Sequence, residues 1–323
     1  MRLQLRVVAF VSAAFLAELF SSCSFEAPRI SAPRYALVYG VSTYQSGFSE
    51  SSAYYPYVPT NPQPPSFFNL SYSDDDCKGI GDEMARQGWA VRERVKGSVG
   101  NTIEQPTKDR MNLDIDDLAT TIGADSTVLI YFSGHGTLVN GTSYIVPYLG
   151  ISDSTTPSID YSLCVTPTDL SSMISRLPTK NVILILDTCY SGGFASSSGA
   201  VDASPSNYSS MAAYSAFGTA LANLGGLLAS NASASGDKAT IVLSAAGSRE
   251  LSYETREYAH GVFTYYLLEA STRGDKDGDG VITVTEAYSY AAEAIKSNFN
   301  LSYGAAFLPH ISGDTRDLVL FTD

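Results

Sequence analysis

The stretch NVILILDTCYSGG, residues 181–193, decides the fold of this chain. Its first six residues, 181–186, are the most apolar strand candidate in the sequence, and the polar stretch that follows ends in two glycines. A second stretch with the same pattern, STVLIYFSGHG at 126–136, begins with an apolar run over 126–132. Uninterrupted apolar runs of this length are typical of strands that are buried on both faces. Both runs are therefore predicted to lie inside a sheet.

Similar apolar runs alternate with helical patterns along the rest of the chain. Further strands are predicted at 35–41, 89–95, 240–246 and 317–321, with a hairpin-like stretch at 144–148. Helices are predicted at 74–88, 113–121, 168–177, 261–273 and 285–298, the third of them capped by Thr168. This alternation predicts an α/β fold, an α/β/α sandwich whose mostly parallel central sheet has about six strands and is covered on both faces.

Composition and charge set limits on the class of protein. The chain has 323 residues, of which 44% are hydrophobic and 16% charged, so most of it is expected to fold. Twenty Lys and Arg against 33 Asp and Glu give a formal net charge of −13, which argues against a nucleic-acid partner. Two stretches interrupt the fold pattern: 42–70 is rich in Ser, Tyr and Pro, and 194–238 in Ser, Ala and Gly. We interpret both as insertions in one domain, 35–323.

The first residues have the pattern of an export signal. Arg2 and Arg6 come before an apolar run at 7–17, and small residues lead to Cys23. This run of eleven residues is too short for a transmembrane helix, which needs about 20. The pattern resembles a relaxed form of the bacterial lipoprotein cleavage box. It implies a signal peptide at 1–22, a lipidated Cys23, a tether at 23–34, and anchoring to a bacterial membrane on the periplasmic face or the cell surface.

Two predicted strands end in residues that can perform nucleophilic chemistry. One strand runs into Ser133, Gly134 and His135, and the other into Asp187 and Cys189. Because ligands bind at the carboxyl edge of such sheets, neighbouring parallel strands would bring the imidazole and the thiol together there. A thiol needs a base or a cationic partner to become a thiolate near neutral pH. The pair is therefore a candidate catalytic dyad, against the alternative of an inert thiol and a structural histidine.

At this point the sequence resembles a family, the caspase-like cysteine peptidases of clan CD, and within it the metacaspase and bacterial orthocaspase branch. The motif Ser-Gly-His-Gly at 133–136 comes before the motif Asp-Thr-Cys-Tyr-Ser-Gly at 187–192, and the segment His-Gly-Val-Phe-Thr at 260–264 follows. The resemblance implies that Cys189 is the nucleophile and His135 its partner. It also implies that the backbone amides of Gly134 and Cys189 hold the oxyanion.

The resemblance also implies a first specificity pocket. Its lining would include Asp76, Ser133 and Asp187, with Ser244 as a further substrate-binding residue. Two carboxylates facing one pocket repel each other unless a cation lies between them, so the pocket should accept Arg or Lys and reject Asp. For Asp76 the open alternative is capping of the helix that begins there, a role that Asp74 or Asp75 could also take.

A second motif has the pattern of a calcium site. Residues 275–286, DKDGDGVITVTE, fit the twelve-residue EF-hand loop, with Gly280 at the turn. The expected ligands are Asp275, Asp277, Asp279, Val281, Thr283 and Glu286. The alternative is an acidic connection between two helices that binds no calcium.

Together these features predict a lipid-anchored cysteine endopeptidase that cleaves protein or peptide substrates after Arg or Lys through an acyl-enzyme, with Ca²⁺ as a modulator. The competing hypothesis is a non-catalytic calcium-binding surface lipoprotein that uses the fold as a scaffold. Many metacaspases cut themselves after a basic residue in the loop beyond the nucleophile. Here no Lys or Arg lies between residues 193 and 238, so we expect one uncut chain or a cut only near Lys238.

Overall fold

The computed structural model describes residues 32–44, 69–97, 101–139, 142–151, 159–188, 239–246, 252–305, 308–313 and 318–322. All of these residues belong to one unit, Ser31–Asp323. The predictions for the signal peptide, for Cys23, for Cys189 and for most of the two insertions fall on residues outside these ranges.

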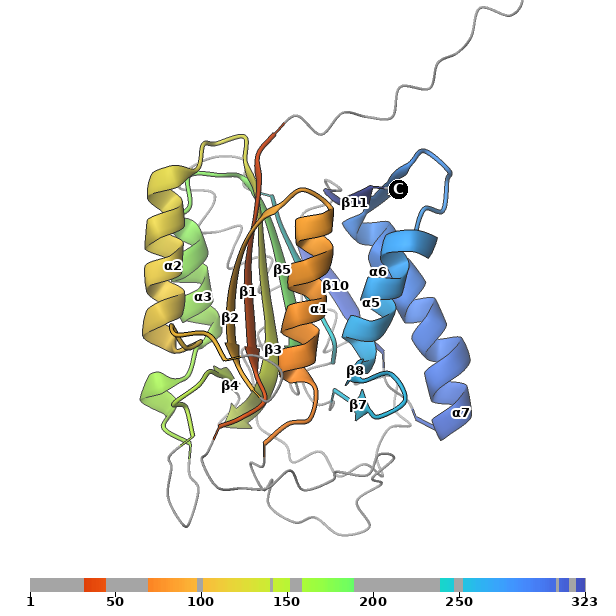
Figure 1. Ribbon diagram of the computed structural model, residues 1–323, viewed down its shortest axis with the longest axis horizontal. Coiled ribbons are helices and arrows are strands. Elements are labelled where there is room, and N and C mark those ends of the chain that lie inside the picture. The colour runs from red at the N-terminus through yellow and green to blue at the C-terminus, as the bar shows by residue number, and fades with distance from the viewer. Residues whose placement is uncertain are drawn as a thin grey trace, which may run out of the picture. The chain divides into compact units, whose positions relative to one another are not determined.

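A central sheet with the strand order β10-β6-β5-β3-β1-β2 forms the middle layer (Figure 1). Its parallel strands are β1 (Arg34–Val41), β2 (Ala90–Lys96), β3 (Thr127–Val139), β5 (Asn181–Thr188) and β6 (Ala239–Ser244). The edge strand β10 (His310–Gly313) runs antiparallel to β6, and β4 (Thr142–Val146) pairs antiparallel with the end of β3. The predicted fold class, a mostly parallel sheet of about six strands, is confirmed.

Helices cover both faces of this sheet (Figure 1). On one face lie α1 (Ser73–Arg86), α5 (Val262–Arg273) and α6 (Val284–Ala294), and on the other lie α2 (Lys108–Thr121) and α3 (Pro167–Ser175). Successive residues of a strand point to opposite faces, so β1 gives Ala36 and Val38 to one core and Leu37 and Tyr39 to the other. Two buried faces explain why the strands are apolar without interruption.

The C-terminal part adds two small sheets and a helical extension. β9 (Val281–Thr283) pairs with β11 (Val319–Thr322), and β7 (Glu254–Thr255) pairs with β8 (His260–Gly261). The predicted last strand is therefore present, but it pairs with β9 and not with the central sheet. A π-helical segment (Ile295–Asn300) and α7 (Leu301–Tyr303) continue α6, and a short 3₁₀ helix occupies Tyr161–Leu163.

Helix starts differ from the predictions where a polar cap precedes the apolar pattern. The helix expected from residue 113 begins at Lys108, because the Thr107 side chain caps it by accepting from the Arg110 N–H. The prediction that Thr168 caps α3 is wrong. Thr166 caps that helix, in a reciprocal capping box with Asp169 and with proline in the first turn. Strand β10, only four residues long, was not predicted.

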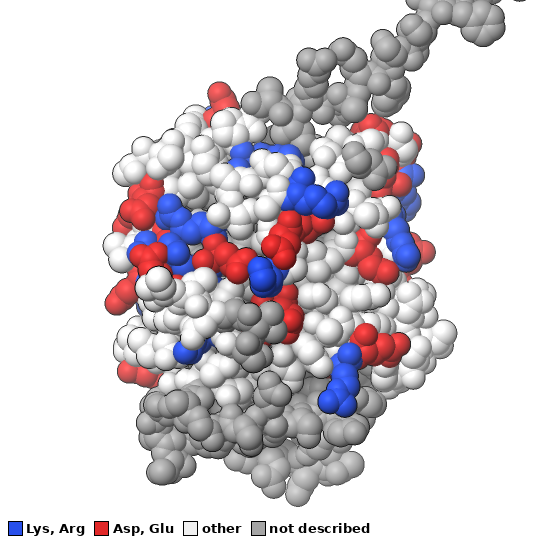
Figure 2. Space-filling model, in the orientation of Figure 1, with Lys and Arg blue, Asp and Glu red and all other residues white. Residues whose placement is uncertain are grey.

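Charged side chains of both signs alternate over the face that carries α1 and α2 (Figure 2). Arg92, Arg94 and Arg110 surround the fully buried carboxylate of Asp114, at distances of 3.1, 2.7 and 2.9 Å. Burial raises the pKa of Asp114, but these guanidinium groups outweigh it and hold that pKa below its usual value.

Within the described ranges, no helix combines the length and the apolarity needed to span a membrane.

Candidate active site

The carboxyl ends of β3 and β5 lie side by side in the central sheet. Their register pairs Ser133 with Asp187 and Gly134 with Thr188. At His135, β3 changes partner and continues against Val146 of β4. His135 and Cys189 each follow directly in the sequence after the last pair, Gly134 and Thr188. The structure thus brings the strand ends that precede His135 and Cys189 to one edge of the sheet, although Cys189 itself is outside the described residues.

Tyr44 supports the backbone around His135. The His135 N–H donates to the Tyr44 hydroxyl at 2.7 Å, and that hydroxyl donates to the Val146 carbonyl at 2.9 Å. The two rings lie with centroids 4.9 Å apart. A side chain at Gly134 would come within 2.7 Å of the Tyr44 hydroxyl and 2.8 Å of the Phe132 ring, so glycine is required there. Tyr44 was not assigned a role from the sequence, since it lies inside the predicted insertion 42–70.

Asp76, in the first turn of α1, is buried and bonded through both carboxylate oxygens. Oδ2 accepts from the Ser133 hydroxyl at 2.9 Å, and Oδ1 accepts from the Gly261 N–H at 2.9 Å. The same Oδ1 lies 2.9 Å from Nδ1 of His260. The residue that precedes the helix is Tyr72, and its side chain makes no capping bond. Asp76 therefore joins α1 to β3 and β8 and is not the helix cap.

Asp187, at the end of β5, is also buried and fully bonded. Oδ1 accepts from the Ser252 hydroxyl at 2.6 Å, and Oδ2 accepts from the Thr264 hydroxyl at 2.6 Å and from its N–H at 3.2 Å. Thr264 lies in the first turn of α5, and its hydroxyl is also 2.6 Å from that of Tyr131. The aspartate is therefore held between the sheet and α5.

The two carboxylates converge on Gly261. A Cβ at this glycine would lie 2.6 Å from Asp187 Oδ2 and 2.9 Å from Asp76 Oδ2. Burial and the negative charge of Asp76 raise the pKa of Asp187 to about 7. Burial also raises the pKa of Asp76, while its hydrogen bonds, first among them the one with His260, act in the opposite direction. The site is thus a desolvated pair of acids that a cation would stabilise.

Glu254 of β7 caps α1 from outside the helix. Its carboxylate accepts from the backbone N–H groups of Ser71 at 2.9 Å and Tyr72 at 3.2 Å, and from the Ser73 hydroxyl at 3.3 Å. Burial raises the pKa of this group to about 7, and the charge of Asp76 adds to the shift. A carboxylate supplied by a distant hairpin therefore fixes the turn that carries Asp76.

Comparison with known proteins identifies the family to which this constellation belongs. A family model of the caspase domain matches residues 34–309. The chain belongs to the caspase-domain family. A crystal structure of a protein from Geobacter sulfurreducens resembles this caspase domain with a TM-score of 0.52 and 14% sequence identity, over 88% of this chain and 95% of that one. At that identity the likeness shows the fold alone. A search of the curated proteins finds no match.

Membership of the family places the caspase domain among cysteine peptidases, which act on proteins or peptides. Of the predicted pocket residues, Asp76, Ser133 and Asp187 are brought together by the bonds described above. Ser244 is buried at the end of β6, where its hydroxyl donates to the Ala246 carbonyl at 2.5 Å. Its role in substrate binding stays a prediction. Cys77 and Cys164 are both free thiols buried in the core.

Four polar residues around Asp76, Asp187 and the start of α1 were not assigned a role from the sequence: Ser252, Glu254, His260 and Thr264. His260 and Thr264 belong to the segment 260–264 that contributed to the family resemblance, and this was the available signal. Ser252 and Glu254 carried none, because their partners lie 65 and 183 positions away along the chain. Their roles depend on how β7 and β8 fold back on α1.

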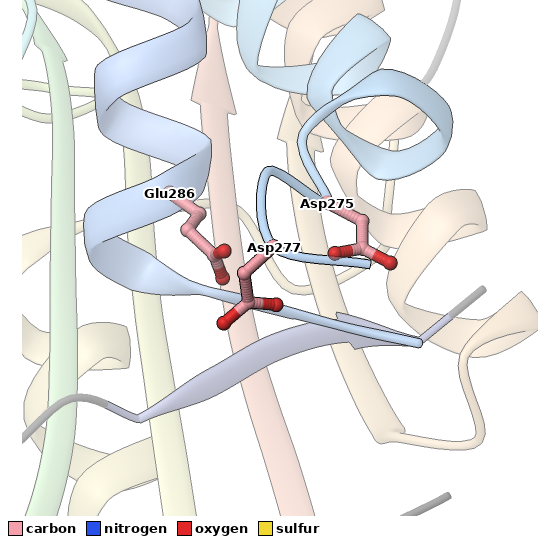
Figure 3. A group of neighbouring side chains, drawn as sticks. All are labelled: Asp275, Asp277 and Glu286. Carbon is pink, nitrogen blue, oxygen red and sulfur yellow. The ribbon is translucent and has the colours of Figure 1, made fainter. Parts of the chain in front are cut away.

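The acidic loop between α5 and α6 brings three carboxylates together (Figure 3). Asp275, Asp277 and Glu286 each offer an oxygen atom, and these atoms lie within 4.8 Å of one another. Gly280 has a φ of +83°, which the turn of an EF-hand loop requires of a glycine. Among the other predicted ligands, Asp279 accepts from the Val281 N–H at 2.9 Å. Thr283 caps α6 in a capping box with Glu286.

Proposed function

We propose that this caspase domain is an endopeptidase that cleaves after Arg or Lys through a Cys189–His135 dyad. The observation that carries the proposal is the convergence of the buried Asp76 and Asp187 carboxylates on Gly261. Asp187 is two residues before Cys189, and Asp76 bonds Ser133, two residues before His135. A guanidinium or ammonium group is the ligand that such a pair favours, because it relieves the repulsion between two desolvated acids. An Asp side chain would add a third negative charge and is expected to be rejected.

The dyad supplies the chemistry of peptide-bond hydrolysis. His135 takes the proton from the Cys189 thiol, and the sulfur attacks the scissile carbonyl to form a tetrahedral oxyanion. Backbone N–H groups of Gly134 and Cys189 stabilise that oxyanion. The C–N bond breaks as the imidazolium gives its proton to the leaving amine. Water then attacks the acyl-enzyme with His135 as the base, which releases the acid and restores the thiol.

The test is cleavage of a panel of fluorogenic peptides that differ only in Arg, Lys, Asn or Asp at the scissile bond. We expect the wild type to cleave the Arg and Lys peptides, and Cys189→Ala to cleave none. A matched control is Cys164→Ala, which removes a buried free thiol from the core between the sheet and the helices α2 and α3. Activity that survives in Cys189→Ala would overturn the nucleophile assignment, and a preference for Asp would overturn the pocket. A folded wild type with no activity would favour the scaffold hypothesis.

We also propose that the loop at 275–286 binds Ca²⁺ and that the ion modulates activity. The donor set fits, since Ca²⁺ prefers carboxylate and carbonyl oxygens at 2.3–2.6 Å and three such carboxylates already cluster. Helix α5 connects the two sites: Thr264 in its first turn holds Asp187, and Asp275 follows its last turn. A shift of the loop can therefore be transmitted along one rigid helix.

Calcium binding can be tested by thermal unfolding with Ca²⁺ or with a chelator. A ligand at about 100 times its Kd stabilises by about 2.7 kcal/mol, so we expect a rise in Tm of several degrees. The rise should disappear in Asp275→Asn and persist in Glu293→Gln, which alters an exposed carboxylate on α6. An equal rise in wild type and Asp275→Asn would contradict the site. Peptide cleavage measured with the same samples tests the modulation.

The N-terminal segment motivates a further part of the proposal, a lipid anchor on Cys23. Phase partition in a detergent that separates lipid-modified from unmodified proteins provides the test. We expect the protein expressed with its N-terminal segment in a bacterial host to enter the detergent phase, and Cys23→Ser to stay in the aqueous phase. The same partition for both proteins would contradict lipidation at Cys23.

A further inference from the structure

His260 lies at the side of the acidic pocket and is not part of the proposed dyad. Its Nδ1 is 2.9 Å from Oδ1 of Asp76, and its side chain is 22% exposed whereas that of Asp76 is 1% exposed. The neighbouring residue is Gly261, whose N–H bonds the same Asp76 oxygen. The imidazole thus contacts one of the two carboxylates directly while keeping access to solvent, and therefore to protons.

The elements around His260 leave room for this ring and surround it with negative charge. A Cβ at Gly79 of α1 would lie 3.1 Å from His260 Cε1 and 3.0 Å from Leu268 Cδ1, so the ring packs on the bare backbone of α1 beside an apolar residue of α5. The charged groups that act on it most strongly are Asp76 and Asp75 from α1 and Asp187 from β5.

We propose that His260 is the internal counter-cation of the specificity pocket. When protonated, it neutralises Asp76 and opposes the binding of a basic side chain. When neutral, it leaves both carboxylates available to that side chain. His260 would thereby set the pH above which the enzyme prefers Arg or Lys. This inference rests on the proposed function and adds to it a residue that positions Asp76 and regulates its charge.

The titration of the group supports this role. Burial lowers the pKa of His260, but the hydrogen bond and the charge of Asp76 outweigh it, so the pKa is raised above its usual value. The imidazolium therefore persists to a higher pH than in a solvated histidine. As the pH rises, loss of the proton from His260 and ionisation of Asp187 both make the pocket more negative. The preference for a cationic side chain must then increase with pH.

The experiment compares kcat/KM for two peptides that differ only in Arg or citrulline at the scissile bond. Citrulline has nearly the shape of Arg and no charge, so the ratio of the two values cancels the titration of the catalytic dyad. In the wild type we expect this ratio to rise between about pH 6 and about pH 9. In His260→Asn, which keeps a hydrogen-bonding group but cannot be protonated, we expect a ratio about tenfold higher than wild type at the acidic end. The two ratios should converge at the alkaline end.

A merely structural histidine gives a different result. Its substitution would change the rates for both peptides together and leave the Arg-to-citrulline ratio at the wild-type value at every pH. That result would overturn the inference and leave the proposed function intact. If the wild type cleaves neither peptide, the proposed function itself fails.

Reciprocal linkage provides a measurement that needs no turnover and no change at His260. In Cys189→Ala the ring signals of the three histidines can be followed by NMR during a pH titration. If His260 and a basic side chain compete for the acids, binding of the Arg peptide must lower the pKa of His260, and the citrulline peptide must not. An Arg peptide that binds without shifting this pKa would overturn the inference.

Discussion

At the scale of single residues, the predicted pocket rests on two acids that are costly to bury and on hydrogen-bond donors that reduce the cost. Asp76 and Asp187 are 1% and 4% exposed, and every carboxylate oxygen of both accepts a hydrogen bond. The donors reduce the penalty for burying two acids close together but do not remove it, as the raised pKa of Asp187 shows. A site of this kind is less stable when empty than an uncharged equivalent would be.

Asp187→Asn is expected to separate stability from activity. The pKa of Asp187 is about 7 in the folded protein against a usual 3.8, so the folded state binds its proton more tightly than the unfolded chain does. The contribution of this protonated carboxyl to the free energy of unfolding is fully present below about pH 4. It is lost as the pH rises through about 7. Asparagine does not ionise, so the variant should gain about 1–3 kcal/mol relative to wild type between about pH 5 and about pH 8. Cleavage after Arg should fall.

Denaturant unfolding of both proteins across this pH range is the measurement. The other titrating groups are common to the two proteins. The informative quantity is therefore the difference between their free energies of unfolding at each pH. A constant or decreasing difference in the free energy of unfolding would show that Asp187 is not held in a charge-disfavouring environment.

Gly261→Ala should damage the pocket without breaking the helix that follows. The backbone φ at Gly261 is −57°, which alanine adopts freely, so the effect comes from the methyl group meeting Asp187 and Asp76. We expect kcat/KM for an Arg peptide to fall about tenfold or more. Gly123→Ala is the control, since nothing lies within 4 Å of its added methyl. Equal activity of both variants would argue against a pocket at this place.

At the scale of elements, α1 depends on a cap that another element supplies. Its preceding residue, Tyr72, makes no side-chain capping bond, and Glu254 from β7 instead accepts from the N–H groups of Ser71 and Tyr72, just before the first turn. The β7–β8 hairpin therefore has two functions: one end fixes the start of α1, and the other places His260 and Gly261 against Asp76.

Glu254→Ala should loosen the start of α1. Removing the carboxylate leaves the N–H groups of Ser71 and Tyr72 without this acceptor, and we expect a loss of about 1–3 kcal/mol in the free energy of unfolding. Amide hydrogen exchange at residues 71–73 should accelerate. Glu293→Ala, an exposed change on α6, is the control and should have little effect. Unchanged protection at residues 71–73 would show that another group caps the helix.

At the scale of the whole molecule, the Asp76–Asp187 pair and the acidic loop lie at opposite ends of α5 (Figure 1). β9 lies within the loop and pairs with β11. Thr322 of β11 bonds Gln87, directly after α1, through its N–H and its hydroxyl, both at 2.8 Å. The two helices that contact the acid pair, α1 and α5, are thus attached at their far ends to the region of the acidic loop.

The distribution of basic residues, together with the proposed specificity, predicts whether the protein cleaves its own chain. A peptidase that requires Arg or Lys at the scissile bond has no cleavage site between residues 193 and 238. We expect mass spectrometry of the active protein, after prolonged incubation, to show an intact chain or a single cut beside Lys238. The Cys189→Ala variant identifies cuts made by contaminating peptidases. A cut elsewhere within 194–237 that requires Cys189 would contradict the proposed specificity.

The sequence by itself determined the parallel strands of the central sheet, the helices between them and the strand ends at which the two predicted motifs stand. Each of these is a local pattern: a strand buried on both faces must be apolar throughout, and residues 181–186 and 126–132 can adopt little else. The starts of α2 and α3 were less accurate, because single threonines decide them and several candidates stand close together.

Only the tertiary structure decided how the acidic residues are used. The chain has 33 Asp and Glu, and nothing local distinguishes Glu254 from the rest. The resemblance singled out Asp76, but the sequence left open whether it lines a pocket or caps its helix. Their roles arise from partners 57 to 185 positions away: Ser133 and Gly261 for Asp76, and the start of α1 for Glu254. The cost of a buried charge depends on the donors and charges that folding brings to it. That environment exists only once β7, β8 and α5 have packed against α1 and the sheet.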